Sequence, residues 1–484
     1  MTKKTIFDKS VAGRAGCLPK EPAKHAKDLL PAGLLRKDRP ALPEVGELEV
    51  VRHFTRLSHL NYSVDGNFYP LGSCTMKYNP KFTDQIASMP GFTRSHPWLG
   101  RLDCTQDLVQ GSLQVIYEVE HLLCELTGMK AFTMQPMAGA HGEFTGVMLI
   151  AAYHRAKGNK KTKMLVPDSS HGTNPASAAL AGYDVVNVPS VNGIVDPEEL
   201  AKFLTDDVAG LMMTCPNTLG LFENNLPRIV EMLRAKDALL YYDGANMNAI
   251  MGHMRVGDVG FDVVHLNLHK TLSTPHGGGG PGSGAVGVSE RLLPYLPNPR
   301  VEKTADGKYR MTDSVKQSMG PVAPFNGNFS VYLRALAYML RLGAEGLTRA
   351  SAYAVLNANY LRKLIDAELE VPFERICMHE FVASAEKQSK EHHVTALDIA
   401  KALLDKGYHA PTIYFPLIVK ECLMFEPTET ESKDTLDQFA ADLLDILATA
   451  KTDPAKVQAA PVTLPVRRLD ETGAARNMIL VQKD

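Results

Sequence analysis

The stretch Val263-Val264-His265-Leu266-Asn267-Leu268-His269-Lys270-Thr271 begins as an apolar, β-branched strand and ends on a lysine between a histidine and a threonine. Burying an ammonium group without a partner costs free energy, and the same burial lowers a lysine's pKa and makes its amine nucleophilic. A run of glycines follows at 277–280, where the backbone can approach a ligand closely. We therefore predict that Lys270 is the reactive amine of a site at the end of this strand.

Strand-like and helix-like patterns alternate along the chain on both sides of this stretch. Short apolar strands are expected at residues 131–134, 163–167, 184–188, 210–214, 238–242, 263–268 and 284–288. Apolar residues at helical spacing predict helices at 105–128, 141–156, 174–181, 197–204 and 227–235. This alternation predicts an α/β fold with a mostly parallel sheet covered on both faces, in which ligands bind at the carboxyl ends of the strands.

The flanking regions have a different character. Residues 1 to about 60 are rich in proline and charge, with one expected helix at 47–57, and residues 69–80 form a turn-rich loop that is either a surface loop or a cover over a site. Residues 294–327 resemble a loop, helices are expected at 330–342 and 349–364, and the tail alternates strands (380–384, 417–419) with helices (396–404, 432–448). We predict an N-terminal arm and loop (1–100), a large domain (101–345) and a smaller C-terminal α/β domain (346–484).

Composition excludes several classes of protein. The 484 residues carry a net charge of -2, which gives no strong field for nucleic acid or an anionic membrane. No apolar run reaches the roughly 18 residues of a membrane span, and the N-terminus has no apolar core of a secretory signal. The seven cysteines form no CxxC pair, and no histidine or carboxylate cluster has metal-ligand spacing. We expect a cytoplasmic protein in a reducing compartment, without a metal site.

Three more of the expected strands end in residues that suit a bound ligand. Small residues, Ala138-Gly139-Ala140, lead into a helix, where free backbone N–H groups and the helix dipole favour a phosphate. His171 follows the strand at 163–167 and is either a structural histidine or an aromatic plate over a flat ring. Asp243 closes the strand at 238–242, where a carboxylate is costly unless it meets a cation such as a pyridinium nitrogen.

Each of these signals is weak by itself, because small turns are commonly close packing and such aspartates are commonly caps. Their order is more specific, since each one follows an expected strand. Together they predict a pyridoxal phosphate site in which Lys270 carries the cofactor, Asp243 meets its ring nitrogen and His171 lies on its ring. His269 and Thr271 are assigned to the phosphate, and Asn246 to the cofactor through its place in the Asp243 turn. The glycine run lacks the order of a P-loop, so nucleotide hydrolysis is not expected.

Longer stretches carry a family resemblance. They are Tyr69-Pro70-Leu71-Gly72-Ser73-Cys74-Thr75-Met76-Lys77-Tyr78-Asn79-Pro80 and segments 135–143, 171–177, 242–249, 267–271, 275–282 and 426–431. From about residue 35 to 450 the chain resembles the glycine decarboxylase family, the pyridoxal-phosphate P-proteins of the glycine cleavage system. The likeness is to the C-terminal half of the long single-chain form, so the chain looks like subunit 2 (beta) of the two-subunit form.

This resemblance implies a fold-type I enzyme that decarboxylates glycine and passes the aminomethyl group to the lipoyl arm of H-protein. It also implies a separate alpha subunit and an α2β2 assembly. Glycine's amine would displace Lys270, which then becomes a candidate acid or base, and the loop at 69–80 would line the access route for glycine or the lipoyl arm. We expect the segment 275–284 to be a mobile loop. The alternatives are an aminotransferase-like or desulfurase-like enzyme of the same fold, or a catalytically silent scaffold subunit.

Overall fold

The computed structural model describes residues 4–16, 24–38, 40–276 and 282–480. The chain forms two compact units, residues 1–63 and 64–484. In its described part the first unit contains η1 (Phe7–Lys9), α1 (Ala26–Leu29), η2 (Ala32–Leu34) and α2 (Glu47–Ser58). The Arg14 guanidinium lies 2.8 Å from the Glu49 carboxylate and ties the N-terminal segment to α2. Helix α2 confirms the helix predicted at 47–57.

The second unit is built on a seven-stranded sheet with the order β1-β9-β8-β7-β6-β2-β3. From β8 to β3 the strands are parallel, whereas β9 is antiparallel to both of its neighbours, β8 and β1. The strands are β1 (Ala131–Thr133), β2 (Lys163–Pro167), β3 (Asp184–Val188), β6 (Val208–Met213), β7 (Leu239–Gly244), β8 (Val263–Leu266) and β9 (Ala285–Val288). This is the mostly parallel sheet that the strand–helix alternation predicts.

Helices bury both faces of this sheet. Successive residues of β7 point to opposite faces: Tyr242 lies in a buried cluster with residues of α5 and α9, and Tyr241 lies in another with residues of α6. Helix α6 packs closely, since a Cβ on Gly146 would come within 2.4 Å of the Tyr241 ring. The helices of this part are α3 (Lys81–Ala87), α4 (Pro90–Thr93), η3 (Pro97–Arg101), η4 (Gln106–Val109), α5 (Gln110–Thr127), α6 (Gly139–Lys157), α7 (Thr173–Leu180), α8 (Pro197–Phe203), α9 (Leu226–Ala235), α10 (Val256–Val259), α11 (Leu268–Thr271) and η5 (Glu290–Tyr295); a hairpin of β4 (Ser190–Val191) and β5 (Ile194–Val195) precedes α8.

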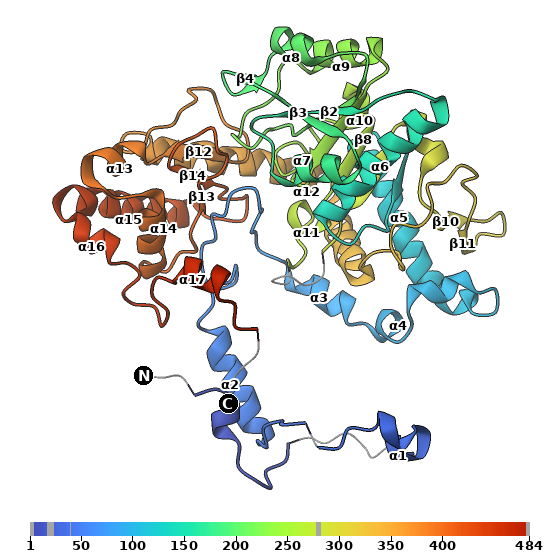
Figure 1. Ribbon diagram of the computed structural model, residues 1–484, viewed down its shortest axis with the longest axis horizontal. Coiled ribbons are helices and arrows are strands. Elements are labelled where there is room, and N and C mark those ends of the chain that lie inside the picture. Colours follow the sequence, from blue (N-terminus) through green and yellow to red (C-terminus); the bar gives the residue numbers. More distant parts are fainter. Residues whose placement is uncertain (1–3, 17–23, 39, 277–281, 481–484) are drawn as a thin grey trace. The chain divides into compact units, whose positions relative to one another are not determined.

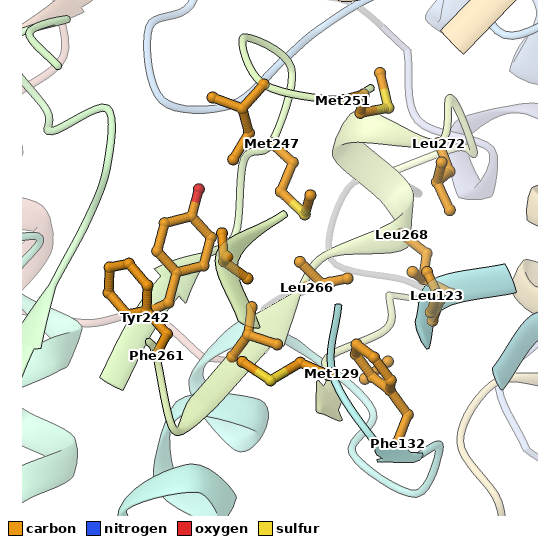
Figure 2. Packing of buried hydrophobic residues seen from close by; sticks show 14 of the residues in the cluster. Leu123, Met129, Phe132, Tyr242, Met247, Met251, Phe261, Leu266, Leu268 and Leu272 are labelled. Carbon is orange, nitrogen blue, oxygen red and sulfur yellow. The ribbon is translucent and has the colours of Figure 1, made fainter. Parts of the chain in front are cut away.

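The larger of these clusters holds the turn that carries Lys270. Figure 2 shows Leu266, Leu268 and Leu272, from β8 and the turn after it, gathered with Leu123 of α5 and Phe132 of β1. Leu268 and Leu272 are buried to within 2% of full burial. Each buried leucine contributes about 1.5–3 kcal/mol, so the core fixes the backbone on both sides of Lys270.

Helix α12 (Phe329–Ile365) leads to the C-terminal part, and its helical geometry is interrupted at Gly343 (φ 64°). A three-stranded antiparallel sheet follows, with the order β12 (Phe381–Ser384), β14 (Cys422–Phe425) and β13 (Thr412–Ile413). Figure 1 shows the helices of this part, in orange and red, gathered beside that sheet: α13 (Glu386–His392), α14 (Ala396–Asp405), α15 (Lys433–Thr452) and α16 (Pro454–Gln458), followed by α17 (Glu471–Arg476). Among the described helices, none combines the length and the hydropathy needed to cross a bilayer. The domain division at residue 345 stays a prediction. The break in α12 at Gly343 lies close to this predicted boundary.

Three local predictions are wrong. The strand expected at 263–268 ends at Leu266, because its neighbours β7 and β9 pair with it only as far as that residue; Lys270 therefore lies on the helical turn α11. The region 294–327, expected to be a loop, contains a hairpin of β10 (Arg300–Lys303) and β11 (Tyr309–Thr312). Residues 417–419 form no strand: they follow a proline, and Leu417 is 85% exposed, whereas the fully buried residues of β14 pair with β12.

Candidate active site

One cavity of about 160 Å³ brings together six of the predicted site residues. They are Gly139, Ala140, His171, Asp243, Asn246 and Lys270. They follow β1, β2, β7 and β8, whose carboxyl ends meet at one edge of the sheet. The topology therefore collects side chains from turns that are far apart in the sequence.

Lys270 lies in the turn α11 and is partly buried. Its Nζ donates a hydrogen bond of 2.8 Å to the backbone carbonyl of Ser73, in the loop at 69–80. Among the described residues Lys270 forms no ion pair, in contrast to the buried Lys77 and the partly buried Arg300. Its amine is thus oriented by a neutral acceptor and faces the cavity.

Asp243 lies near the end of β7 and is only 4% exposed. Its carboxylate accepts hydrogen bonds of 3.1 Å from the side-chain amide of Asn174 and from the backbone N–H of Ala245. The ring nitrogen Nε2 of His265 lies 3.5 Å from the carboxylate and has no hydrogen-bond partner among the described residues. Burial lowers the pKa of His265 to about 4, so this histidine is neutral and brings no charge. A buried carboxylate in such surroundings suits a cationic ring nitrogen in the cavity.

The N-terminus of α6 suits a phosphate. Its N-cap residue, Ala138, offers no side-chain hydrogen bond to the first turn, so backbone N–H groups remain for a ligand. A Cβ on Gly139 would lie 2.7 Å from Nδ2 of Asn267, so a larger residue at this position would require the Asn267 side chain to shift. The Oδ1 atom of Asn267, in the same cavity wall, has no hydrogen-bond partner among the described residues. The N–H donors of α6 fit the phosphate of pyridoxal phosphate, Asp243 fits its ring nitrogen, and Lys270 fits its aldehyde carbon.

His171 borders the cavity on a loop between β2 and α7. Its Nδ1 lies 2.7 Å from the Thr173 hydroxyl, which in turn donates to the Glu143 carboxylate at 2.9 Å. Desolvation lowers the pKa of His171, which favours the neutral, flat imidazole that would lie against a ring. The edge-on contact with Phe415, at 5.5 Å between ring centroids, fixes its orientation further.

His269 and Thr271 do not line the cavity. The Thr271 hydroxyl accepts a hydrogen bond of 2.8 Å from the Met247 N–H, and Nδ1 of His269 accepts one of 3.1 Å from the Ser283 N–H. Burial lowers the pKa of His269 to about 3, so its ring carries no charge for a phosphate. Their assignment to the phosphate stays a prediction, and the structure gives both residues a role in holding the turn.

Further lining residues were not foreseen in the sequence, among them Glu143, His379 and Glu380. Burial and the nearby Asp243 raise the pKa of Glu143 to about 8. The sequence could have indicated Glu143, because this acidic residue lies one helical turn after the small residues 138–140, on the buried face of α6. His379 and Glu380 come from the C-terminal part, just before β12, where charged residues directly preceding an apolar strand were the signal available.

The loop at 69–80 is an anchored wall of this region. Ser73 lines the cavity, and Thr75 donates to the Glu426 carboxylate through its N–H (2.9 Å) and its hydroxyl (2.7 Å). Lys77 is 2% exposed and lies 2.8 Å from the Glu429 carboxylate. The surface-loop interpretation is therefore wrong for this part of the loop. Residues 277–281 of the predicted mobile loop at 275–284, which include its glycine run, lie outside the described residues.

Known proteins match this chain along nearly its whole length. Two family models match it: aminotransferase class-V over residues 142–300, and glycine dehydrogenase, C-terminal domain, over residues 350–462. A probable glycine dehydrogenase (decarboxylating) subunit 2 of Kosmotoga olearia is 54% identical over 477 residues, 98% of each chain. A protein of the same name from Caldanaerobacter subterraneus is 55% identical over 459 residues, 94% of this chain and 93% of that one. The chain belongs to the glycine dehydrogenase (decarboxylating) subunit 2 family.

Solved structures relate the glycine dehydrogenase subunit 2 fold to other enzymes. A glycine decarboxylase (P-protein) of the glycine cleavage system, in inhibitor-bound form, matches with a TM-score of 0.73 at 21% identity, over 87% of this chain and 95% of that one. Glutamate decarboxylase of Lactobacillus brevis matches with a TM-score of 0.64 at 13% identity, over 93% and 98%. At these identities the likeness shows the fold, which is the fold-type I architecture of pyridoxal-phosphate enzymes.

Proposed function

We propose that this chain decarboxylates glycine with bound pyridoxal phosphate and passes the remaining aminomethyl group to the lipoyl arm of H-protein. One observation carries the proposal: the Lys270 amine, the buried Asp243 carboxylate and the uncapped N-terminus of α6 meet in a single cavity. The family to which the chain belongs supports glycine as the substrate, since relatives of 54–55% identity bear the name glycine dehydrogenase (decarboxylating).

Each residue of the cavity has a distinct task in this proposal. Lys270 would hold the cofactor through its amine, which the amine of glycine would replace. Asp243 keeps the ring nitrogen protonated, and the N–H groups of Gly139 and Ala140 bind the phosphate. When bound, pyridoxal phosphate supplies an electron sink for the carbanion that remains after CO2 leaves.

Other residues control geometry and water. His171 covers one face of the ring position and limits the approach of solvent from that side. The Ser73 carbonyl, 2.8 Å from Nζ, orients the Lys270 amine, so that after its release it is positioned to move a proton within the cavity. The enclosure of the cavity by the loop at 69–80 protects a carbanion from premature protonation by water.

The proposal includes partners and a location. The name subunit 2 that the relatives bear supports a partner, the alpha subunit (subunit 1). We propose that the two subunits form an α2β2 assembly. Lipoylated H-protein is the acceptor because the reaction needs a disulfide that takes up two electrons. We place the reaction in the cytoplasm.

The decisive experiment is glycine-dependent exchange of labelled bicarbonate into the carboxyl group of glycine, with the alpha subunit and lipoylated H-protein present. Exchange that disappears in Lys270→Ala, together with the borohydride-sensitive visible absorbance of the cofactor, supports the proposal. A cofactor spectrum with amino-group transfer to a keto acid, but without exchange, would indicate an aminotransferase. Absence of both would indicate a scaffold subunit. The fold cannot make this choice, since a cysteine desulfurase of Thermococcus onnurineus shares it with a TM-score of 0.58 at 14% identity.

A further inference from the structure

Two buried glutamates that no step above uses lie close together, and one of them, Glu380, lines the Lys270 cavity. Glu380 directly precedes β12 and Glu426 directly follows β14, and the antiparallel register that pairs Phe381 with Phe425 sets them opposite each other. They are 3% and 0% exposed. One side-chain atom from each, together with one from His379, lies within 4.8 Å of the others. Like charges in such a cross-strand position are unfavourable, so the arrangement calls for a proton between them.

Hydrogen bonds distinguish the two carboxyl groups. Glu426 accepts from the Thr75 N–H at 2.9 Å, from the Thr75 hydroxyl at 2.7 Å and from the Asn246 amide at 2.8 Å. Glu380 accepts from the Ser73 N–H at 2.7 Å. Because donated hydrogen bonds stabilise the ionised form, and Glu380 receives one such bond against three for its neighbour, we assign the proton of the pair to Glu380.

The surroundings of Glu380 favour its neutral form. Burial and the nearby Glu426 raise its pKa well above its ordinary value, and Lys270 opposes them only in part. Burial lowers the pKa of His379, so this neighbour is neutral, and neither of its ring nitrogens has a hydrogen-bond partner among the described residues. The remaining titratable groups that face Glu380 are thiols, whose own pKa values are raised by burial: Cys74, Cys377 and Cys422.

The position of Glu380 relates it to the chemistry. Its carboxyl group lines the same cavity as Lys270, and the Ser73 peptide joins the two: the N–H binds Glu380 and the carbonyl binds Lys270. A proton held on Glu380 is therefore available at the Lys270 end of the cavity. Among the described carboxyl groups that line the cavity, Glu143, Asp243 and Glu380, only Glu380 accepts a hydrogen bond from the 73–75 backbone.

We infer that Glu380 is the general acid of the transfer step, an inference that rests on the function proposed above. In that step the carbon that has lost CO2 forms a bond to one sulfur of the lipoyl disulfide, and the bond between the two sulfurs breaks. The carbon is oxidised by two electrons, the disulfide is reduced, and the second sulfur leaves as a thiolate. Glu380 gives this thiolate its proton. Protons balance because glycine arrives as an ammonium ion and leaves as a neutral aminomethyl group. The proton that its nitrogen loses restores the one that Glu380 gives to the thiolate.

Infrared difference spectroscopy of the assembled enzyme tests the protonation directly, without turnover. Glu380→Gln, which keeps an acceptor for the Ser73 N–H, should remove one carboxylic-acid C=O band that titrates above the ordinary range of glutamate. Glu426→Gln should lower the pH at which that band disappears. Glu223→Gln is the matched control: burial raises the pKa of Glu223 to about 7, and its carboxyl group accepts from the Val195 N–H at 2.9 Å, yet it does not line the Lys270 cavity. It should remove a different band.

Kinetics of the same enzyme test the role. The variant Glu380→Gln should release lipoyl thiol about 10²–10⁴-fold more slowly, while the cofactor absorbance stays and the loss of rate at alkaline pH, due to deprotonation of the acid, disappears. Glu380→Asp should restore part of the rate, and Glu223→Gln should leave it unchanged. An unchanged rate and pH profile in Glu380→Gln, or an unchanged infrared spectrum, would overturn the inference alone. A wild-type enzyme that releases no thiol with glycine would overturn the proposed function and this step with it.

Discussion

Lys77 and Lys270 both lie at the turn α11, and their surroundings are opposite. Lys77, in the loop at 69–80, is fully enclosed: its Nζ donates to the Glu429 carboxylate (2.8 Å), the Asn248 amide (3.0 Å) and the Thr271 carbonyl (2.7 Å). Lys270, one residue before Thr271, donates to the Ser73 carbonyl and faces the cavity. The ion pair with Glu429 raises the pKa of Lys77 against the effect of burial.

The difference shows what makes a lysine reactive. Burial is more complete for Lys77, yet a carboxylate and two neutral acceptors hold its ammonium charged and fixed, which removes its nucleophilicity. Lys270 has a neutral acceptor only and is exposed to a ligand. The two lysines are also coupled, because Lys77 binds the carbonyl of the residue after Lys270 and so positions the turn α11. Lys77 therefore has a structural role, because it holds the turn on which Lys270, the proposed reactive lysine, lies.

The largest effect is expected from removal of the Lys270 amine. Lys270→Ala should lower activity by about 10⁴-fold or more, since it removes the bond to the cofactor and an acid–base group worth about 10²–10⁴ by itself. The free energy of unfolding of the cofactor-free protein should change by about 1 kcal/mol or less, because only the hydrogen bond to Ser73 is lost. Exchange assays and urea unfolding measure the two quantities. Normal exchange in this variant would remove Lys270 from the mechanism.

The second effect lies at Lys77. Lys77→Met should destabilise the chain by about 3–5 kcal/mol, because it leaves the Glu429 carboxylate, half of an ion pair whose side chains are 1% and 9% exposed, without its cation. The double variant Lys77→Met, Glu429→Gln should recover most of this loss, and thermal unfolding of both variants provides the measurement. If the single and double variants lose equal stability, the ion pair is not the reason for the burial of Lys77.

The third prediction concerns the pH dependence of stability that Glu143, an acid in the Lys270 cavity, produces. Among the described residues Glu143 forms no ion pair with a lysine or arginine, and burial and the nearby Asp243 raise its pKa to about 8, against an ordinary 4.5. Between these values the folded chain binds more protons than the unfolded one, so this group makes stability fall as pH rises through that window. Glu143→Gln should flatten the fall and be more stable by about 2–4 kcal/mol at alkaline pH in the cofactor-free protein. The exposed Glu231, changed to Gln, is the control that should follow the wild-type curve.

The smallest effect on stability is expected at Tyr338, a neighbour of Lys77. Tyr338 lies 3.5 Å from its Nζ, a distance at the limit of a hydrogen bond. Tyr338→Phe should therefore cost about 0.5–1 kcal/mol of unfolding free energy, measured by the same thermal unfolding. A loss as large as that of Lys77→Met would show that the tyrosine, and not the carboxylate, dominates the surroundings of the ammonium group.

Much of the site could be predicted because it repeats a local rule. His171, Asp243 and Lys270 each follow an apolar strand, and parallel strands bring their carboxyl ends to one edge, so order along the chain gave neighbours in space. Glu143, His379 and Glu380 escaped this rule. Glu143 lies one turn inside a helix, and the other two precede a strand of a separate antiparallel sheet. Nothing in the sequence shows against which turn that sheet packs.

By itself, the sequence determined the mostly parallel sheet and the helix over 47–58, and it predicted the reactive lysine, because strand–helix alternation and the residues that follow a strand are local properties. Only the tertiary structure decided that β8 stops at Leu266, that the loop at 69–80 is held through Thr75 and Lys77, and that two glutamates at one end of an antiparallel pair face each other near Lys270. These features depend on partners from about 20 to more than 350 residues away, and the free energies that fix them, desolvation and charge pairing, exist only once those partners are in contact.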